Sequence, residues 1–392
     1  MSALDFFTGE NRRLSVKILI VINDFFNKSN GMSISTQRFV TSLRKMGHEV
    51  RIAANASNGN PEYPMEVLRI PVFAGIIEKE GYTFAKINKK LLEEAVDWAD
   101  VVHVEDPFFL CAKAARIAKS KAKTVTGTFH LYPENMTYSV HIGKSVFFNY
   151  VFMTAFKNGV YNKCDRIMCP TDQVKARLKK YHFSADLYTI SNGIPEEIVD
   201  YGYSKLPCRS NKINERKKFR IITVGRYSKE KNQGLLLDAL LKCQNNENIE
   251  LTVAGKGPLE NELKQKASLL PFEVEFDFFE QDELLEKMSQ ADIYVHCADI
   301  EVEGMSCMEA FACGAVPLIS KAKLSSTKSY ALDDNNIYEA DDSDDLAGKI
   351  DYWIEHPKEL EASRKKYMQM AKNMTVDNSA QKLLDMMRGE ML

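Results

Sequence analysis

A repeated alternation of short apolar runs with helical patterns is the feature that most constrains the fold of this chain. The first run, residues 16–22, is nearly continuous and rich in β-branched residues, as in a strand covered on both faces. A polar loop, a helical pattern ended by Gly47 and a strand beginning at Val50 follow it. This order is the βαβ unit of a parallel sheet. The alternation continues to about residue 181 and starts again with a strand at 219–224.

The two series predict an α/β protein with two doubly wound, Rossmann-like domains that face a central cleft. The chain has 392 residues, which exceeds one compact domain and suits two. We expect an N-terminal domain at residues 1–195, a linker at 196–218, a second domain at 219–375 and a C-terminal helix at 376–392 that packs back toward the first domain. The linker is indicated by Pro195, Gly202, Pro207 and a polar run at 209–218. Because ligands of such sheets bind at the carboxyl ends of the strands, the cleft is the expected site.

Composition excludes several classes of protein. Apolar residues make up 45% and charged residues 27%, which are ordinary globular values. The net charge of −2 gives no electrostatic basis for general nucleic-acid binding, so no nucleic-acid partner is expected. Residues 1–200 carry 26 Lys+Arg and 21 Asp+Glu, whereas residues 201–392 carry 26 and 33. This asymmetry fits contact of one end with an anionic surface, and it equally fits a random scatter of a few charges.

Cysteine spacing and the N-terminal residues indicate a cytoplasmic protein. None of the eight cysteines forms a C-x-x-C pair, and no Cys/His cluster has zinc spacing, so we expect reduced and mostly buried thiols. Residues 1–16 are charged and lack the apolar stretch of a secretory signal. No segment approaches the roughly 20 apolar residues that a membrane-spanning helix needs.

The most informative motif runs from Glu301 to Glu309, between a strand and a helix. Gly304 allows a tight turn that brings the backbone close to a ligand. The helix that begins near Met305 and Ser306 offers unpaired N–H groups that favour phosphate, and Glu309 can accept hydrogen bonds from ribose hydroxyls. An alternative is purely structural, because Ser306-x-x-Glu309 is also a capping box, with Gly314 as the C-terminal cap.

Two further loops after strands carry cations or glycines. Gly225-Arg226 and Lys231 lie after the first strand of the second domain, where Arg and Lys suit a diphosphate, although such runs also form solvated turns. Gly255-Lys-Gly257 follows the next strand and does not have the spacing of a dinucleotide fingerprint.

Two residues of the first domain also fall on loops that face the cleft. Gly31 is in the first such loop, and His130 follows the strand near residue 126. His130 is either a core histidine or a polar donor at the cleft.

Taken together and in this order, these segments resemble the retaining nucleotide-sugar glycosyltransferases of family 4, which have the GT-B fold. The resemblance covers essentially the whole chain, and the Glu301-x7-Glu309 spacing is its most specific part. It implies that Glu301 contacts the donor sugar, Glu309 holds the ribose, and Arg226 with Lys231 binds the donor pyrophosphate. It implies further that Gly31 approaches the phosphates and that His130 lies near the transferred sugar.

The resemblance assigns catalytic roles to His130, Glu301, Arg226 and Lys231. The expected donor-binding set is Gly31, Gly225, Arg226, Lys231, Gly255, Gly257, Phe279, Glu301, Gly304, Met305, Ser306 and Glu309. The second domain is then the nucleotide-sugar side and the first domain the acceptor side.

Within the family, the chain looks most like bacterial lipid glycosyltransferases that make monoglycosyl-diacylglycerol. Glu301-Val-Glu-Gly304 resembles their E-x-x-G form, and the His130 segment with Tyr132 and Tyr138 looks like theirs. Departures are Phe278, where many relatives have glycine, and about 15 residues before the first strand. The resemblance implies transfer of glucose or galactose from a UDP-sugar to diacylglycerol or ceramide. A soluble glycosyltransferase of capsular or surface glycans and a non-catalytic nucleotide-sugar-binding protein are the alternatives.

The resemblance implies no cofactor and no metal, since the departing diphosphate is met by fixed positive groups. Asp342-Ser-Asp344 resembles a metal-binding D-x-D, but it precedes a helix, where acidic residues complement the dipole.

An aromatic segment at residues 146–157 is a candidate membrane contact. Phe147, Phe148 and Phe152 belong to it, and Lys175, Lys179 and Lys180 add positive charge nearby in sequence. Aromatic residues flanked by cations suit a helix resting on anionic lipid, which would make the protein peripheral on the inner face of the plasma membrane. A buried helix beside a solvated basic face is the alternative.

Overall fold

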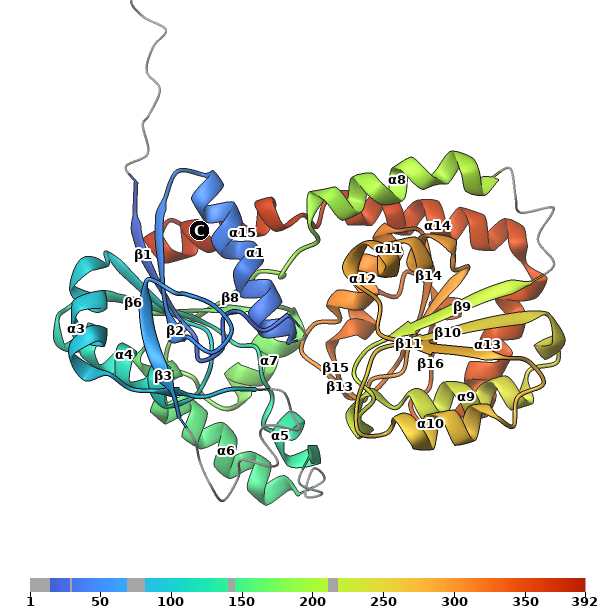
Figure 1. Ribbon diagram of the computed structural model, residues 1–392, viewed down its shortest axis with the longest axis horizontal. Coiled ribbons are helices and arrows are strands. Elements are labelled where there is room, and N and C mark those ends of the chain that lie inside the picture. Colours follow the sequence, from blue (N-terminus) through green and yellow to red (C-terminus); the bar gives the residue numbers. More distant parts are fainter. Residues whose placement is uncertain (1–14, 29, 69–81, 140–144, 211–217, 392) are drawn as a thin grey trace, which may run out of the picture.

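The computed structural model describes residues 15–28, 30–68, 82–139, 145–210 and 218–391, and shows two α/β domains lying side by side (Figure 1). The expected residues before the first strand lie largely outside this range. The first domain holds a sheet of strand order β4-β3-β2-β1-β5-β6-β7-β8, parallel except for the β3–β4 pair. Its strands are β1 (Lys17–Val21), β2 (Glu49–Asn55), β3 (Tyr63–Val67), β4 (Ala85–Lys86), β5 (Val101–Val104), β6 (Thr124–Thr128), β7 (Arg166–Cys169) and β8 (Asp186–Thr189).

Helices cover the first sheet on both faces. They are α1 (Gly31–Lys45), α3 (Lys89–Trp98), α4 (Phe109–Ser120), α5 (Pro133–Ser139), α6 (Val146–Gly159) and α7 (Asp172–Lys180). Helix α1 begins where the side chain of Asn30 accepts hydrogen bonds from the backbone N–H groups of Met32 and Ser33. The central strand β1 is buried almost throughout, as its apolar sequence predicts.

The second domain repeats the design with strand order β11-β10-β9-β12-β14-β16, and every pair in it is parallel. Its strands are β9 (Phe219–Val224), β10 (Ile249–Ala254), β11 (Val274–Asp277), β12 (Ile293–His296), β14 (Val316–Ser320) and β16 (Ile337–Tyr338), with a separate pair β13 (Ile300–Glu301) and β15 (Leu324–Ser325). Its helices are α9 (Gln233–Lys242), α10 (Glu260–Ala267), α11 (Gln281–Gln290), α12 (Met305–Ala312), α13 (Ser343–Glu355) and α14 (Pro357–Lys372).

Both sheets reverse their strand order next to the first strand of the domain. Strand β1 is flanked by β2 and β5, and β9 is flanked by β10 and β12. Ligands of open α/β sheets bind at such switch points, outside the carboxyl ends of the strands. Two doubly wound Rossmann-like domains were expected, and the structure confirms this fold class.

The segment expected as a linker is largely helical. Residues 196–210 form α8 (Glu196–Ser210), whose side chains Ile198 and Val199 join the core of the second domain. The hydroxyl of Tyr201 donates to Oε2 of Glu286 at 2.5 Å, which ties the helix to α11. Residues 211–217 of the expected linker lie outside the described residues. Gly202, read from sequence as a sign of a linker, is instead a close-packing position, because a β-carbon there would overlap the carbonyl oxygen of Ala312.

The C-terminal helix α15 (Val376–Arg388) lies on the first domain beside α1 (Figure 1). Ala380, Leu383 and Met387 join a core cluster that also contains side chains of β1. Arg166 of β7 donates to the carbonyl oxygens near the end of the helix. The chain therefore crosses between the domains twice, and the two crossings pair through hydrogen bonds between Ile194 and the segment at 374–376.

Among the described residues, every helix is too short or too polar to span a membrane.

Two glycines inside helices form a matched test of the packing of α8. Replacing Gly202 by Ala overpacks the α8–α12 contact and should lower the free energy of unfolding by about 1–3 kcal/mol. Gly348 of α13 is exposed and has no atom near its β-carbon position, so Gly348→Ala should leave stability unchanged or raise it by up to about 1 kcal/mol. Urea unfolding of both variants measures the contrast, and equal effects would show that α8 is not packed as described.

Candidate functional site

An ion pair marks the site at the end of the second sheet. Nζ of Lys231, the last residue of the 3-10 turn at Lys229–Lys231, contacts Oε2 of Glu301, which ends β13. The two side chains are only 26% and 18% exposed. Burial alone would lower the pKa of Lys231, but the Glu301 carboxylate outweighs it and raises that pKa. The pair therefore places a permanent cation at the carboxyl end of the sheet.

His296 adds a buried neutral group beside this pair, and sequence reasoning did not single it out. It ends β12, and its Nε2 lies 4.0 Å from Oε2 of Glu301. Burial, together with the charge of Lys231, lowers the pKa of His296 to about 3. Nε2 is enclosed and has no hydrogen-bond partner among the described residues. The only sequence signal was a polar residue at the end of an apolar strand.

Helix α12, which follows Glu301, does not begin with the capping box that Ser306 and Glu309 would form. Gly304 is the N-cap of α12, and Met305 is its first residue. The hydroxyl of Ser306 instead lies 2.9 Å from the hydroxyl of Tyr294, so it faces the sheet. A β-carbon at Gly304 would come within 2.6 Å of Oγ1 of Thr327, which explains the glycine by packing.

Glu309 of α12 is held by a residue of the other domain. Nη2 of Arg38, on α1, donates to Oε1 of Glu309 at 2.6 Å. The side chains are 17% and 15% exposed, so the pair is shielded from solvent. Arg38 was not predicted, since its partner is 271 positions away in sequence.

The remaining glycines and Arg226 shape neighbouring loops. A β-carbon at Gly255 would overlap the carbonyl oxygen of Gly225, and one at Gly257 would overlap the backbone of Tyr227. Both glycines therefore let two strand-end loops pack together. The stem of Lys231 runs beside Gly225, 3.8 Å from its β-carbon position. The carbonyl oxygen of Arg226 accepts from Nε2 of Gln233 at 2.8 Å, which fixes this loop.

Two other positions expected to bind the donor, Gly31 and Phe279, are not among the contacts of the Lys231–Glu301 pair described above. Gly31 is the first residue of α1, and a β-carbon there would meet no atom within 4 Å. This open space is compatible with the close approach of a ligand. Phe279 is buried, and the ammonium of Lys287 lies 5.3 Å from the centre of its ring.

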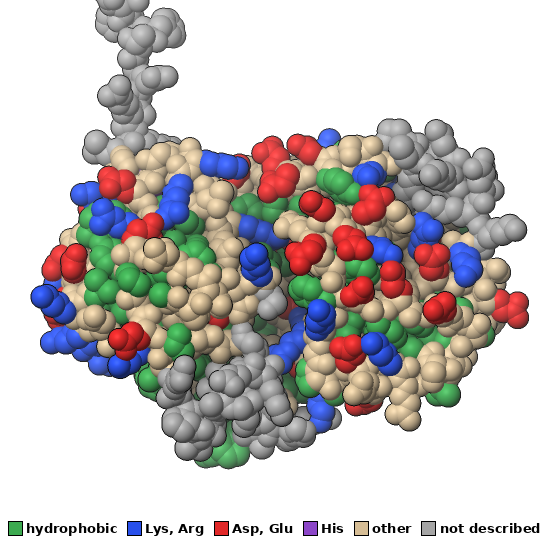
Figure 2. Space-filling view, in the orientation of Figure 1, with side chains coloured by type: hydrophobic (Ala, Val, Ile, Leu, Met, Phe, Trp, Pro, Cys, Tyr) green, Lys and Arg blue, Asp and Glu red, His purple; other side chains and the backbone are tan. Residues whose placement is uncertain are grey.

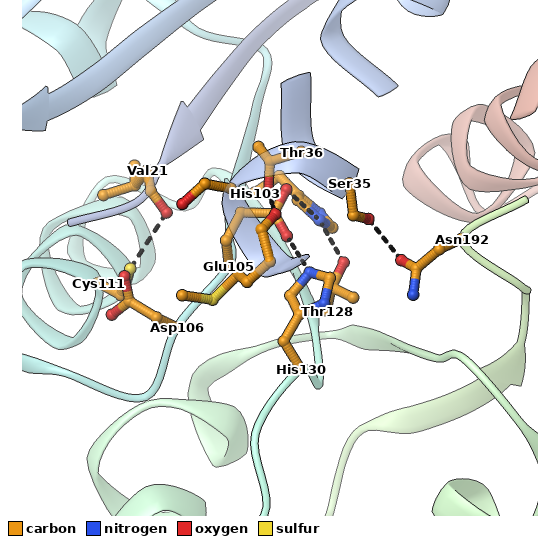
Figure 3. A network of polar contacts seen from close by, with 12 residues as sticks. Val21, Ser35, Thr36, His103, Glu105, Asp106, Cys111, Thr128, His130 and Asn192 are labelled. Carbon is orange, nitrogen blue, oxygen red and sulfur yellow. Dashed lines mark hydrogen bonds and ion pairs between the residues drawn. The ribbon is translucent and has the colours of Figure 1, made fainter. Parts of the chain in front are cut away.

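His130 belongs to a buried polar network in the first domain (Figure 3). Its Nε2 lies 2.9 Å from Oε2 of Glu105, which follows β5. On the other side of Glu105, Nε2 of His103 lies 3.6 Å from Oε1. His130 is thus a buried histidine that follows β6 and pairs with a carboxylate. Glu105 and His103 were not predicted.

The strand pair β13–β15 joins the second domain to the first. Ile300 and Val302, on either side of Glu301, lie in a core cluster of first-domain residues. Glu303 accepts hydrogen bonds from the backbone N–H and the side-chain amide of Asn192, both at 2.7 Å. Asn192 accepts in turn from the hydroxyl of Ser35 on α1 at 2.6 Å. The segment at residues 300–303, which starts the Glu301–Glu309 motif, is therefore in contact with both domains.

The residues expected at the acceptor or membrane side separate into two groups. Tyr132 is fully buried beneath the guanidinium of Arg177, 4.3 Å from the centre of its ring, so it cannot touch a membrane surface. Tyr138 is partly buried on α5, which contacts the 3-10 turn at Lys229–Lys231 of the second domain. Burial, followed by the charges of Asp299 and Asp341, raises the pKa of Tyr138.

The N-terminal half of α6 projects apolar side chains into solvent. Phe147 is 68% exposed and Phe148 43%, while Phe152 is partly buried. Lys157 of α6 donates to the carbonyl oxygen of Tyr181 at 3.0 Å, which connects the helix to the end of α7. Lys179 and Lys180 are exposed there, and Lys175 is partly buried. The space-filling view shows Asp and Glu gathering over the second domain, in keeping with the charge asymmetry (Figure 2).

Asp342 has a structural role. Its side chain is the N-cap of α13 and accepts from the backbone N–H groups of Asp344 and Asp345. In the part of the chain that the structure describes, no cluster of His, Cys, Asp and Glu is arranged to hold a metal ion.

Two family models match the chain, one in each domain. The model described as Glycosyltransferase Family 4 matches residues 29–198, and the model described as Glycosyl transferases group 1 matches residues 209–374. Together they cover both domains and most of the residues considered above.

Named relatives and solved structures are similar over most of the chain. Alpha-monoglucosyldiacylglycerol synthase of Streptococcus pneumoniae is 24% identical over 78% of this chain and 71% of its own length. GDP-mannose-dependent alpha-mannosyltransferase of Corynebacterium glutamicum is 22% identical over 78% and 72%. The crystal structure of Anabaena Alr3699/HepE in complex with UDP-glucose superposes with a TM-score of 0.69 at 16% identity, covering 95% of this chain and 100% of that one. Together with the two Rossmann-like domains, this likeness confirms the expected GT-B fold.

Proposed function

This chain belongs to the glycosyltransferases of family 4, and from that premise we propose that it moves a hexose, glucose or galactose, from a UDP-sugar to a lipid hydroxyl with retention of the anomeric configuration. The observation that carries the proposal is the enclosed Lys231–Glu301 pair beside the Arg226 loop. Lys231 of this pair supplies a cation at the end of the second sheet, where a nucleotide diphosphate binds in folds of this kind.

In the proposed reaction, the bond between C1 of the hexose and the diphosphate oxygen breaks. A bond from the acceptor oxygen to C1 forms on the same face, and the acceptor proton passes to the departing diphosphate. Lys231 and Arg226 stabilise the negative charge that develops on that leaving group. Glu301 does not act as a nucleophile in this scheme, because its carboxylate is engaged by Lys231. Glu309 holds the ribose and keeps its contact with Arg38 through Oε1.

We propose turnover without a divalent metal ion. The D-x-D at residues 342–344 already has a role, since Asp342 caps α13. The chain's own cations would then carry the charge stabilisation.

The acceptor assignment rests on α6 and on the relatives. Exposed aromatic side chains on α6 suit contact with lipid. The ring centre of Tyr150 on α6 lies 6.0 Å from that of Tyr181 at the end of α7, where Lys179 and Lys180 are exposed and can meet anionic head groups. The streptococcal relative is named for a glycolipid product. We therefore propose a diacylglycerol or ceramide acceptor, reached from the cytoplasmic face of the membrane by a peripheral enzyme.

The direct test is release of UDP from UDP-glucose and UDP-galactose, with and without diacylglycerol or ceramide in mixed micelles, in buffer with EDTA. We expect acceptor-dependent release of UDP from at least one donor in EDTA. Turnover only with oligosaccharide acceptors would favour a glycan-extending enzyme. Binding of UDP-hexose without any turnover would favour a non-catalytic binding protein, and activity restored only by Mg²⁺ or Mn²⁺ would contradict the metal-free proposal.

Removing either cation should slow the same reaction. Arg226→Ala and Lys231→Ala should each lower kcat roughly 10²–10³-fold, the scale of losing one charge-stabilising donor. Lys242→Ala, which removes an exposed lysine paired with Asp344, is the matched control and should retain activity. Full activity in both cleft variants would contradict the diphosphate assignment.

If α6 is the membrane contact, its exposed aromatic residues should be required for binding to vesicles. Sedimentation with phosphatidylglycerol–phosphatidylcholine vesicles should show binding that weakens with salt, and Phe147→Ser should reduce it at least about tenfold. Leu269→Ser removes an equally exposed side chain, 68% exposed, from the second domain and should have no effect. No sedimentation at low salt, or equal losses in the two variants, would remove this interface from the proposal.

A further inference from the structure

Glu105 is a buried carboxylate held between two histidines, and the mechanism above gives it no role. It is 1% exposed and directly follows the carboxyl end of β5. One carboxylate oxygen lies 2.9 Å from Nε2 of His130, and the other lies 3.6 Å from Nε2 of His103 (Figure 3). A buried carboxylate stays ionised only when hydrogen-bond donors surround it, so these contacts determine whether Glu105 is charged.

His103 forms the fixed side of this arrangement. Its Nδ1 lies 2.8 Å from Oγ1 of Thr126, and its Nε2 lies 2.8 Å from Oγ1 of Thr128. Burial lowers its pKa, and the Glu105 carboxylate offsets part of this effect. Both ring nitrogens are therefore occupied by groups of the adjacent strand β6, and His103 cannot turn toward the cleft.

Glu105 remains ionised. Burial alone would raise its pKa, but the two histidines outweigh burial and lower it. A carboxylate only accepts hydrogen bonds, so the His130 nitrogen facing it must carry the proton. In a neutral imidazole the other nitrogen, Nδ1, is then an acceptor.

We propose that Glu105 is a positioning residue that holds His130 in the tautomer protonated on Nε2. Nδ1 then accepts a hydrogen bond from a sugar hydroxyl in the cleft. This role rests on the proposed function for the hydroxyl, whereas the tautomer itself follows from the contacts of Glu105. A glutamine in place of Glu105 keeps the shape and removes the charge. Because its amide can donate to Nε2, it no longer favours the proton there.

The first experiment is ¹⁵N NMR of histidine-labelled full-length protein, with the His130 signals assigned by their loss in His130→Gln. We expect His130 protonated on Nε2 alone in the wild type and a shift of the proton toward Nδ1 in Glu105→Gln. Glu105→Asp keeps the carboxylate and should keep the wild-type tautomer, so it reports on charge if the glutamine variant is unstable. An imidazolium in the wild type, or the same tautomer with Gln, overturns the proposal.

The second experiment is a double-mutant cycle on turnover. Glu105→Gln should lower kcat roughly 10–100-fold, and it should cost nothing further in a His130→Ala background, because the two act as one unit. Asp165→Asn is the matched control: Asp165 holds the N–H of Val125 at the opposite end of the same sheet, and its loss should spare kcat. An undiminished effect of Glu105→Gln without His130 overturns the positioning role. Absence of turnover in every form of the protein would count against the proposed function, while the NMR result still decides the tautomer.

Discussion

A parallel sheet that is covered on both faces leaves one main place for ionisable side chains, the ends of its strands, and the whole site follows from this constraint. Strands β5 and β12 are buried at every residue. Glu105 follows the first of them, and His296 ends the second. Because these groups are also enclosed, each carboxylate must find a donor: Glu301 takes Lys231, and Glu105 takes His130. The pairing of charged groups in the candidate site therefore follows from their burial as well as from their residue types.

The fold was accessible from the sequence, and so were the loops of the second domain that make up half of the candidate site, since both depend on local patterns. Apolar runs of strand length predicted the two sheets, and glycines beside charged residues marked the loops of Arg226 and Glu301. The groups that were missed depend on partners far away in the chain. In the sequence, His103 and Glu105 are two polar residues in and just after an apolar strand. Their role becomes visible only with the neighbouring strand β6, whose Thr126 and Thr128 hydrogen-bond to the ring of His103.

Two local patterns have a different use in the fold from the one that their residue types suggest. In the sequence, Gly202 indicates a linker, and the Ser306-x-x-Glu309 spacing leaves a helix cap open as an alternative, because each residue type has a common local use. In the fold, Gly202 allows a helix to approach the carbonyl oxygen of Ala312, and the Ser306 hydroxyl contacts Tyr294 across the sheet. Local propensity could not reveal either contact, since both depend on how α8 and α12 pack on the second sheet.

The apolar residues that flank Glu301 determine how easily the two domains can separate. Ile300 and Val302 are buried among first-domain side chains, so the segment that carries Glu301 also anchors one domain to the other. Separating the domains would expose both side chains to water, at a cost of roughly 1.5–3 kcal/mol each. This burial would therefore oppose any motion that opens the two domains by pulling β13 away from the first domain.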